Sequence, residues 1–166
     1  MSKFFEKIKK IASENEKVAM FVDMDGTITV YDVYPESDVN ENMADNYQML
    51  EPVNYVIDIL RKINEIQNVD VYILTLSRDR SITEEKKIWL NKYVNFIDED
   101  KWIIVTKELG EYNKENRDTI KAEKMKEKLN KYNYEILLDD DHKILKETQK
   151  ILGNNASVFH ISAAII

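Results

Sequence analysis

Residues 17–27 read KVAMFVDMDGT, an apolar run followed at once by two aspartates and a glycine. An unbroken apolar run of this length is typical of a strand that is buried on both faces, as in the middle of a parallel sheet. Asp23 follows the last apolar residue, so we expect the strand to end there. The stretch therefore predicts a central strand that brings Asp23 and Asp25 to one edge of a sheet.

Strand-like runs and helical patterns alternate along the rest of the chain. We expect strands at about 69–75, 102–105, 134–138 and 158–161, and helices near the N-terminus and at about 52–63, 81–93, 118–129 and 143–152. This alternation predicts an α/β fold: a doubly wound, Rossmann-like parallel sheet with helices on both faces. In such folds ligands bind beyond the carboxyl ends of the strands.

Capping residues predict where these helices begin and end. Pro52 suits the first turn of a helix, Ser81 and Glu84 match a capping box, and Asp118 is a suitable N-cap. Gly153 is expected to end the helix that precedes the last strand.

Residues 28–50 are polar, aromatic and without a sustained period, which indicates a short insertion after the first strand. We expect residues 1–166 to form a single domain with this cap-like insertion. The insertion is too short for a full cap domain, so the site should be open or covered by a neighbouring subunit. Tyr31, Tyr34 and Tyr47 either stack on a base or sugar of the substrate or pack against the body of the domain.

The composition excludes several classes of function. The formal net charge of −7 disfavours long nucleic acid, whose binding depends on neutralising phosphates with Lys and Arg. The absence of cysteine excludes thiolate metal sites and cysteine nucleophiles. No apolar run is long enough to span a bilayer, and the N-terminus lacks the apolar core of an export signal. We expect a cytoplasmic protein with no membrane partner; the sequence leaves the oligomeric state open.

Five aspartates follow two of the predicted strands: Asp23 and Asp25 after the first, and Asp139, Asp140 and Asp141 after the fourth. Crowded carboxylates repel one another and call for a cation, and hard oxygen ligands favour Mg²⁺ over Zn²⁺. Each aspartate alone is more often a helix cap. Together they predict a magnesium site. An EF-hand is excluded, because glycine stands at the fourth position of the loop and not the sixth.

The order of these elements resembles the haloacid dehalogenase superfamily of phosphatases across residues 18–140. The resemblance is carried by FVDMDGT at 21–27, a hydroxyl residue ending the second strand, a lysine near a helix start and the aspartate pair after the fourth strand. Within that superfamily, DMDG at 23–26, ILT at 73–75, the EK and WL pairs within 85–90, and LLDD at 137–140 are similar to the 5'(3')-deoxyribonucleotidase-like branch.

The resemblance implies roles for the acidic residues. Asp23 would be the nucleophile that forms an aspartyl-phosphate, and Asp25 would protonate the leaving oxygen and later activate water. Mg²⁺ would be held by Asp23, the backbone carbonyl of Asp25 and Asp139. Asp140 is counted with this metal site and is also available to orient the catalytic lysine.

The resemblance also requires a hydroxyl and a lysine that bind the phosphate. Thr75 is the expected hydroxyl, with Ser77 as the alternative at the same strand end. Lys121 is the expected lysine because it lies in the first turn of the helix before the fourth strand, with Lys107 and Lys86 as competitors.

These assignments predict a Mg²⁺-dependent phosphomonoester hydrolase for a small phosphorylated substrate, with a nucleotide or deoxynucleotide as the best single choice. One alternative is a 3'-phosphatase acting on nucleic-acid ends, which the acidic charge disfavours. Another is a noncatalytic phosphate-binding regulatory domain, which the presence of both Asp23 and Asp25 disfavours.

Overall fold

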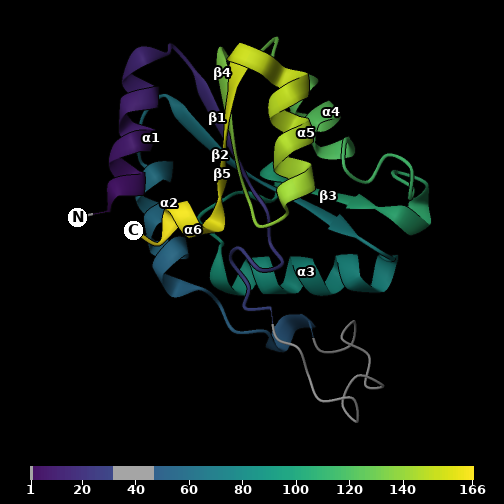
Figure 1. Cartoon of the computed structure of the whole chain (residues 1–166). Coiled ribbons are helices and arrows are strands. Elements are labelled where there is room, and N and C mark those ends of the chain that lie inside the picture. Colours follow the sequence, from purple (N-terminus) through teal and green to yellow (C-terminus); the bar gives the residue numbers. More distant parts are fainter. Residues whose placement is uncertain (1, 32–46) are drawn as a thin grey trace.

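A five-stranded, all-parallel sheet forms the centre of the computed structural model, which describes residues 2–31 and 47–166 (Figure 1). The strand order is β3-β2-β1-β4-β5. The strands are β1 (Val18–Val22), β2 (Val69–Ser77), β3 (Trp102–Thr106), β4 (Tyr134–Asp139) and β5 (Ala156–His160). Central β1 pairs with β2 and β4, with Val18 level with Val69 and Tyr134. The predicted doubly wound α/β fold is confirmed.

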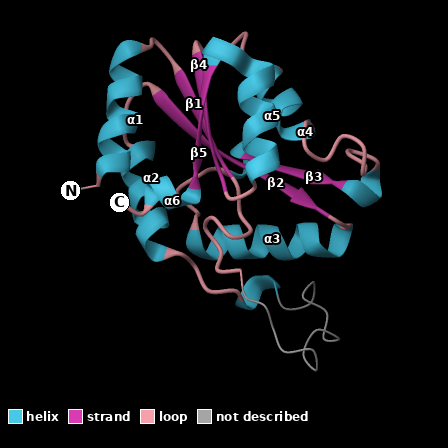
Figure 2. Ribbon diagram, in the orientation of Figure 1, coloured by secondary structure: helices cyan, strands magenta, loops and turns pink. Residues whose placement is uncertain are grey.

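Helices cover both faces of the sheet (Figure 2). One face carries α1 (Lys3–Glu14), α2 (Asn54–Asn64), α3 (Arg80–Tyr93) and the short α6 (Ile161–Ala164). The other carries α4 (Ile120–Lys126) and α5 (His142–Leu152). Short 3₁₀ turns lie at η1 (Tyr47–Met49), η2 (Glu99–Lys101), η3 (Lys107–Leu109) and η4 (Gly153–Asn155). Within the described ranges, none of the helices has the length and apolar character needed to cross a membrane.

Strand β1 is apolar throughout because it contributes to both cores. Met20 and Val22 pack with the residues of α1 and α2, whereas Ala19 and Phe21 pack with those of α4 and α5. Phe21 stacks on Tyr72 of β2 with ring centroids 5.0 Å apart. All five residues of β1 are buried, each large apolar side chain contributing about 1.5–3 kcal/mol relative to exposure. Asp23 is therefore anchored to the most tightly held strand of the sheet.

The predicted starts of α2 and α3 are both wrong. Pro52 forms an isolated bridge with Thr29, so α2 begins only at Asn54. At α3 the N-cap is Asp79, whose carboxylate accepts a hydrogen bond from the Ile82 backbone N–H at 2.9 Å. The capping box predicted to start at Ser81 therefore lies inside the first turn of the helix.

The predicted boundaries around α4 and β5 also need correction. Asp118 does not cap α4; it pairs with Arg117 at 3.1 Å, and the helix begins after Thr119, which makes no side-chain cap. The last strand ends at His160, and Ile161 opens a short helix that the sequence pattern did not predict. Gly153 does end α5, as predicted.

The insertion predicted at 28–50 is seen only at its two ends. Residues 32–46, including Tyr34, lie outside the described residues, so the cap-like insertion and the single-domain assignment remain predictions. Tyr31 at one end is 65% exposed, whereas Tyr47 at the other is 4% exposed and packs into the core. For Tyr47 the packing alternative is the correct one.

Glu135 of β4 is a fully buried acidic residue. Its side chain is on the same side of the strand as Leu137, facing α4 and α5. Neither carboxylate oxygen has a hydrogen-bond partner among the residues that the structure describes. Burial raises the pKa of Glu135 from 4.5 to about 8, and Lys128 opposes the rise only in part. Glu135 is therefore a neutral acid in the folded chain at neutral pH.

We expect this acid to make the fold less stable as pH rises. The unfolded chain loses the Glu135 proton near 4.5 while the folded chain keeps it to about 8, so between these values the folded state binds one more proton. Urea unfolding of the native chain and Glu135→Gln, at about pH 5.5 and about pH 7.5, should show a smaller fall in unfolding free energy for the variant. An identical fall in both proteins would contradict the assignment.

Candidate active site at the carboxyl edge of the sheet

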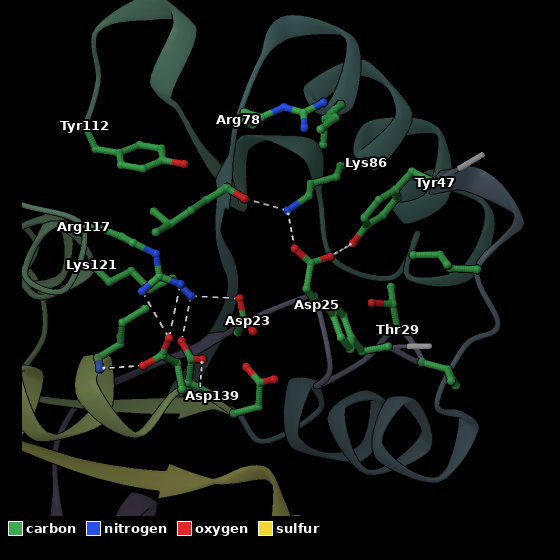
Figure 3. A pocket seen from close by; sticks show the side chains of 18 of the residues that line it. Asp23, Asp25, Thr29, Tyr47, Arg78, Lys86, Tyr112, Arg117, Lys121 and Asp139 are labelled. Atoms are coloured by element: carbon green, nitrogen blue, oxygen red, sulfur yellow. Dashed lines mark hydrogen bonds and ion pairs between the residues drawn. The ribbon is translucent and has the colours of Figure 1, made fainter. Parts of the chain in front are cut away.

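A cavity of about 710 Å³ opens at the carboxyl ends of β1, β2 and β4 (Figure 3). Its lining is strongly charged: acidic side chains from the ends of β1 and β4 face lysines from α3 and α4. This is the position at which doubly wound folds bind ligands. The aspartates that the sequence pattern singled out all lie on its wall.

Three of the five aspartates form a compact acidic cluster. Asp23, Asp139 and Asp140 each offer a carboxylate oxygen within 4.8 Å of the others. The register explains the meeting: Val22 of β1 lies level with Leu138 of β4, and the next residue of each strand is an aspartate. Asp23 and Asp139 are almost fully buried. Oxygen donors this close could hold a hard divalent cation.

Lys121 neutralises part of this cluster from the first turn of α4. Its Nζ donates to Asp23 Oδ1 at 2.8 Å and to Asp139 Oδ2 at 2.7 Å. Burial alone would lower the pKa of Lys121, but the two carboxylates raise it above its usual value, so the ammonium stays charged. The expected contact between Lys121 and Asp140 is not formed; Lys121 contacts Asp139 instead.

Lys121 compensates the negative charge of Asp23 only in part. Burial raises the pKa of Asp23 to about 7, with Lys121 opposing the rise and Asp139 adding to it. Burial and Asp139 likewise raise the pKa of Asp140. One ammonium facing three carboxylates leaves an excess of negative charge, and a divalent cation would remove it.

Asp141, the fifth aspartate, is a helix cap. Its carboxylate accepts hydrogen bonds from the backbone N–H groups of Lys143 and Ile144 and is paired with Arg117 at 3.2 Å. Although partial burial acts to raise the pKa of Asp141, these contacts lower it overall. The capping interpretation of a strand-end aspartate is thus correct here.

The loop after β1 turns tightly against the cluster. Gly26 has a φ of +77°, and a Cβ at this position would lie 2.3 Å from Asp140 Oδ2. Thr27 closes the same turn by donating its hydroxyl to Asp23 Oδ2 at 3.3 Å. A side chain at position 26 would therefore be strained and would displace Asp140.

Asp25 points to a different set of partners from those of Asp23. Lys86 of α3 lies 3.1 Å from its Oδ2, and the Tyr47 hydroxyl donates to its Oδ1 (Figure 3). The carboxylate of Asp25 is not part of the three-membered acidic cluster. Its predicted contribution to metal binding, through the backbone carbonyl, stays a prediction.

The two candidate hydroxyls at the end of β2 are used differently. Thr75 Oγ1 accepts a hydrogen bond from Lys86 Nζ at 2.7 Å and keeps its own proton available for donation. Ser77 donates to the Asp79 carbonyl at 2.9 Å and accepts from Thr83 at 2.7 Å, so its hydroxyl is occupied at the start of α3. Thr75 is fully buried and lies outside the cavity lining, but it is linked to Asp25 through Lys86 Nζ; its predicted contact with phosphate stays a prediction.

The three candidate lysines lie in three different places. Lys121 contacts Asp23, Lys86 contacts Asp25, and both are buried on the cavity wall. Lys107 is exposed in the 3₁₀ turn after β3, away from the lining residues. The geometry therefore separates Lys121, next to Asp23, from the other two.

Arg78, Tyr112 and Arg117 are among the cavity-lining residues that the sequence pattern did not single out. Arg78 follows β2 directly, and Tyr112 and Arg117 come from the loop between β3 and α4. Arg117 ties that loop to Asp141. Arg78 directly follows a strand, which was an available signal, but polar loop residues are too common for the sequence to single out any of the three.

Comparison with known proteins identifies solved structures with a similar fold. No family model and no curated protein matches the chain. The HAD domain of the effector protein Lem4 from Legionella pneumophila is similar in structure: its inactive mutant matches with a TM-score of 0.53 and 17% identity, over 87% of this chain and 84% of that one. The unmutated Lem4 domain gives 0.49 and 16%, over 87% of each chain.

A protein assigned as a haloacid dehalogenase-like hydrolase from Burkholderia xenovorans gives a TM-score of 0.46 and 10% identity, over 86% of this chain and 81% of that one. The match to the Lem4 mutant shows that the chain has the haloacid dehalogenase (HAD) fold. The resemblance inferred from the motifs is confirmed at the level of the fold.

The contact between Gly26 and Asp140 can be tested against a matched glycine. Gly110 also has a φ of +77°, but a Cβ there would meet nothing within 4 Å. We expect both Gly26→Ala and Gly110→Ala to lose roughly 1–3 kcal/mol from backbone strain. Only Gly26→Ala should also reduce the rise in melting temperature caused by Mg²⁺, because it displaces Asp140. The same Mg²⁺-dependent rise in both variants would show that Asp140 does not belong to the metal site.

Proposed function

We propose that this chain is a Mg²⁺-dependent phosphomonoester hydrolase in which Asp23 is the nucleophile. The observation that carries the proposal is the buried Asp23 carboxylate, held by Lys121 within an acidic cluster on a cavity wall that also carries Asp25. The HAD fold supports this proposal, since the aspartates occupy the carboxyl ends of adjacent central strands.

The acidic cluster fits a magnesium ion. Asp23, Asp139 and Asp140 supply hard oxygen donors, and the backbone carbonyl of Asp25 would complete the protein's share. When bound, the ion would offset the repulsion between an incoming phosphate dianion and the attacking carboxylate. Lys121 already offsets one charge of the cluster and can do the same for the phosphoryl group.

The side chains of the cavity can carry both halves of the reaction. An Asp23 oxygen forms a bond to phosphorus while the ester P–O bond breaks, and Asp25 gives its proton to the departing oxygen. Water then attacks the phosphorus, Asp25 takes a proton from that water, and the bond to Asp23 breaks to release phosphate. The Thr75 hydroxyl donates to a phosphoryl oxygen.

The size and lining of the cavity favour an organic phosphate larger than phosphate itself. A volume of about 710 Å³ is that of a pocket for a medium-sized ligand. The exposed ring of Tyr31 and the ring of Tyr112 are both available to stack on a flat group. We therefore propose a nucleotide or deoxynucleotide as the substrate, in line with the deoxyribonucleotidase-like motifs.

A panel of phosphomonoesters, assayed with Mg²⁺ and after exhaustive chelation, tests the proposal. We expect hydrolysis of nucleoside monophosphates only when Mg²⁺ is present, because the cluster otherwise repels the phosphate. Full turnover without metal would refute the role of the cluster. Binding of a phosphomonoester without turnover would favour a noncatalytic domain.

Two matched variants separate the roles of the aspartates. Asp23→Asn keeps the shape but removes the nucleophile, so we expect no covalent phosphate and only background activity. Asp25→Asn removes the proton carrier, and with it the charge paired with Lys86, but keeps the Asp23 nucleophile. Its pre-steady-state burst should therefore fall much more on a nucleotide, which expels a basic alkoxide, than on p-nitrophenyl phosphate, which expels a stable phenolate. Covalent phosphate trapped on Asp23→Asn would rule out Asp23, and equal losses on the two esters would rule out Asp25 as the acid.

A further inference from the structure

Helix α3 binds the chain where it returns from the insertion. Trp89 Nε1 donates to the Leu50 carbonyl at 2.9 Å, and Glu85 accepts from the Gln48 backbone N–H at 3.4 Å. Residues 85 and 89 are one helical turn apart and lie on the same face of α3. These contacts fix the position of the returning segment, residues 47–50, against the rim of the cavity.

Lys86 lies within this face, with a side chain that is only 1% exposed. Its ammonium donates to Asp25 Oδ2 at 3.1 Å, to Thr75 Oγ1 at 2.7 Å and to the Leu76 carbonyl at 2.7 Å. An ammonium has three N–H donors, and all three are used. Lys86 therefore has no donor left for a phosphate in this arrangement, but it holds both the proposed acid and the proposed hydroxyl donor.

Tyr47 holds the other oxygen of the same carboxylate. Its hydroxyl donates to Asp25 Oδ1, and its ring lies 5.4 Å from Lys86 Nζ. Burial, with the nearby Asp25 charge adding to it, raises the pKa of Tyr47 above its usual value, so the hydroxyl keeps its proton. Asp25 itself is 44% exposed and faces the cavity with both oxygens directed by buried groups.

We infer that Lys86 and Tyr47 are positioning residues that orient the Asp25 carboxyl for proton transfer, and that the returning segment 47–50 is thereby part of the active site. The inference rests on the proposed function, in which the Asp25 proton passes to the ester oxygen as the P–O bond breaks and the Asp23–phosphorus bond forms. Neither Lys86 nor Tyr47 touches the reacting atoms in that step; both act through Asp25, and Lys86 also acts through Thr75.

A purely structural role explains the arrangement less well. A buried lysine loses much of its hydration, and an apolar side chain of similar volume is often as stabilising at such a position. Lys86 instead donates two of its three hydrogen bonds to the side chains of Asp25 and Thr75, both of which take part in the proposed reaction. Tyr47 likewise places its hydroxyl on Asp25 although its ring is already buried in the core.

Burst kinetics on two esters test the inference. With saturating Mg²⁺, we expect Tyr47→Phe and Lys86→Met to slow the burst about threefold to tenfold more on a nucleoside monophosphate than on p-nitrophenyl phosphate, the scale of one hydrogen bond. Tyr93→Phe and Lys87→Met are matched controls. Tyr93 packs on Trp89 from the same helix, and Lys87 is the next residue, paired with Glu84. Both should leave the ratio of the two burst rates unchanged.

A double variant separates positioning from a structural effect. If Tyr47 acts only through Asp25, adding Tyr47→Phe to Asp25→Asn should cause no further loss of the p-nitrophenyl phosphate burst, whereas a structural defect would add to it. Should Lys86→Met fail to fold, Tyr47→Phe still decides the matter.

The outcomes are distinguishable from failure of the proposed function. A wild-type burst with equal losses on both esters in Tyr47→Phe, or a further loss in the double variant, would overturn the positioning role alone. No Mg²⁺-dependent hydrolysis of any ester by the wild-type chain would overturn the proposed function, and the positioning role with it.

Discussion

The ammonium group of Lys121, held between Asp23 and Asp139, is the interaction on which the carboxyl edge of the sheet depends. Adjacent parallel strands end at the same level, so two strand-end aspartates necessarily meet, and their charges repel in a buried setting. A single lysine cannot offset Asp140 as well. The fold therefore reaches this edge with an unbalanced negative charge, which suits it to a divalent cation; a bound cation would in turn attract an anionic ligand.

The layout of the fold could be predicted because long apolar patterns leave few alternatives. The apolar run at 18–22 predicts a strand that is buried on both faces. Because helices lie between successive strands, these strands are expected to pair in parallel, with the helices as crossover connections. The exact helix starts could not be predicted. Asp79 and Ser81 are both suitable N-caps for α3, and the structure has Asp79 in that position. Pro52 pairs with Thr29 instead of starting α2, a contact that forms only in the folded chain. Where two residues are equally suitable for starting a helix, tertiary contacts of this kind determine which of them does so.

The site was predictable where it depends on strand ends and unpredictable where it depends on distant side chains. Asp23 and Asp139 could be found because each comes at the end of an apolar run that predicts a strand. The partners of Lys86 could not, because its contact with Asp25 joins residues 61 positions apart. For the same reason the sequence could not distinguish Lys121, Lys86 and Lys107: each is a lysine in or beside a loop or helix start, and only the fold shows which carboxylate each one meets.

The two buried lysines also explain how neighbouring aspartates come to occupy different surroundings. Asp23 and Asp25 are two residues apart, but the first contacts Lys121 and belongs to the acidic cluster, whereas the second contacts Lys86 of α3. Asp23 is nearly enclosed, whereas Asp25 stays half open to the cavity. In the proposed function Asp23, as the nucleophile, would be held near a metal and away from water, whereas Asp25, as the proton carrier, would reach both an ester oxygen and solvent. The separation of the two carboxylates by one turn of backbone and two lysines provides both environments within three residues.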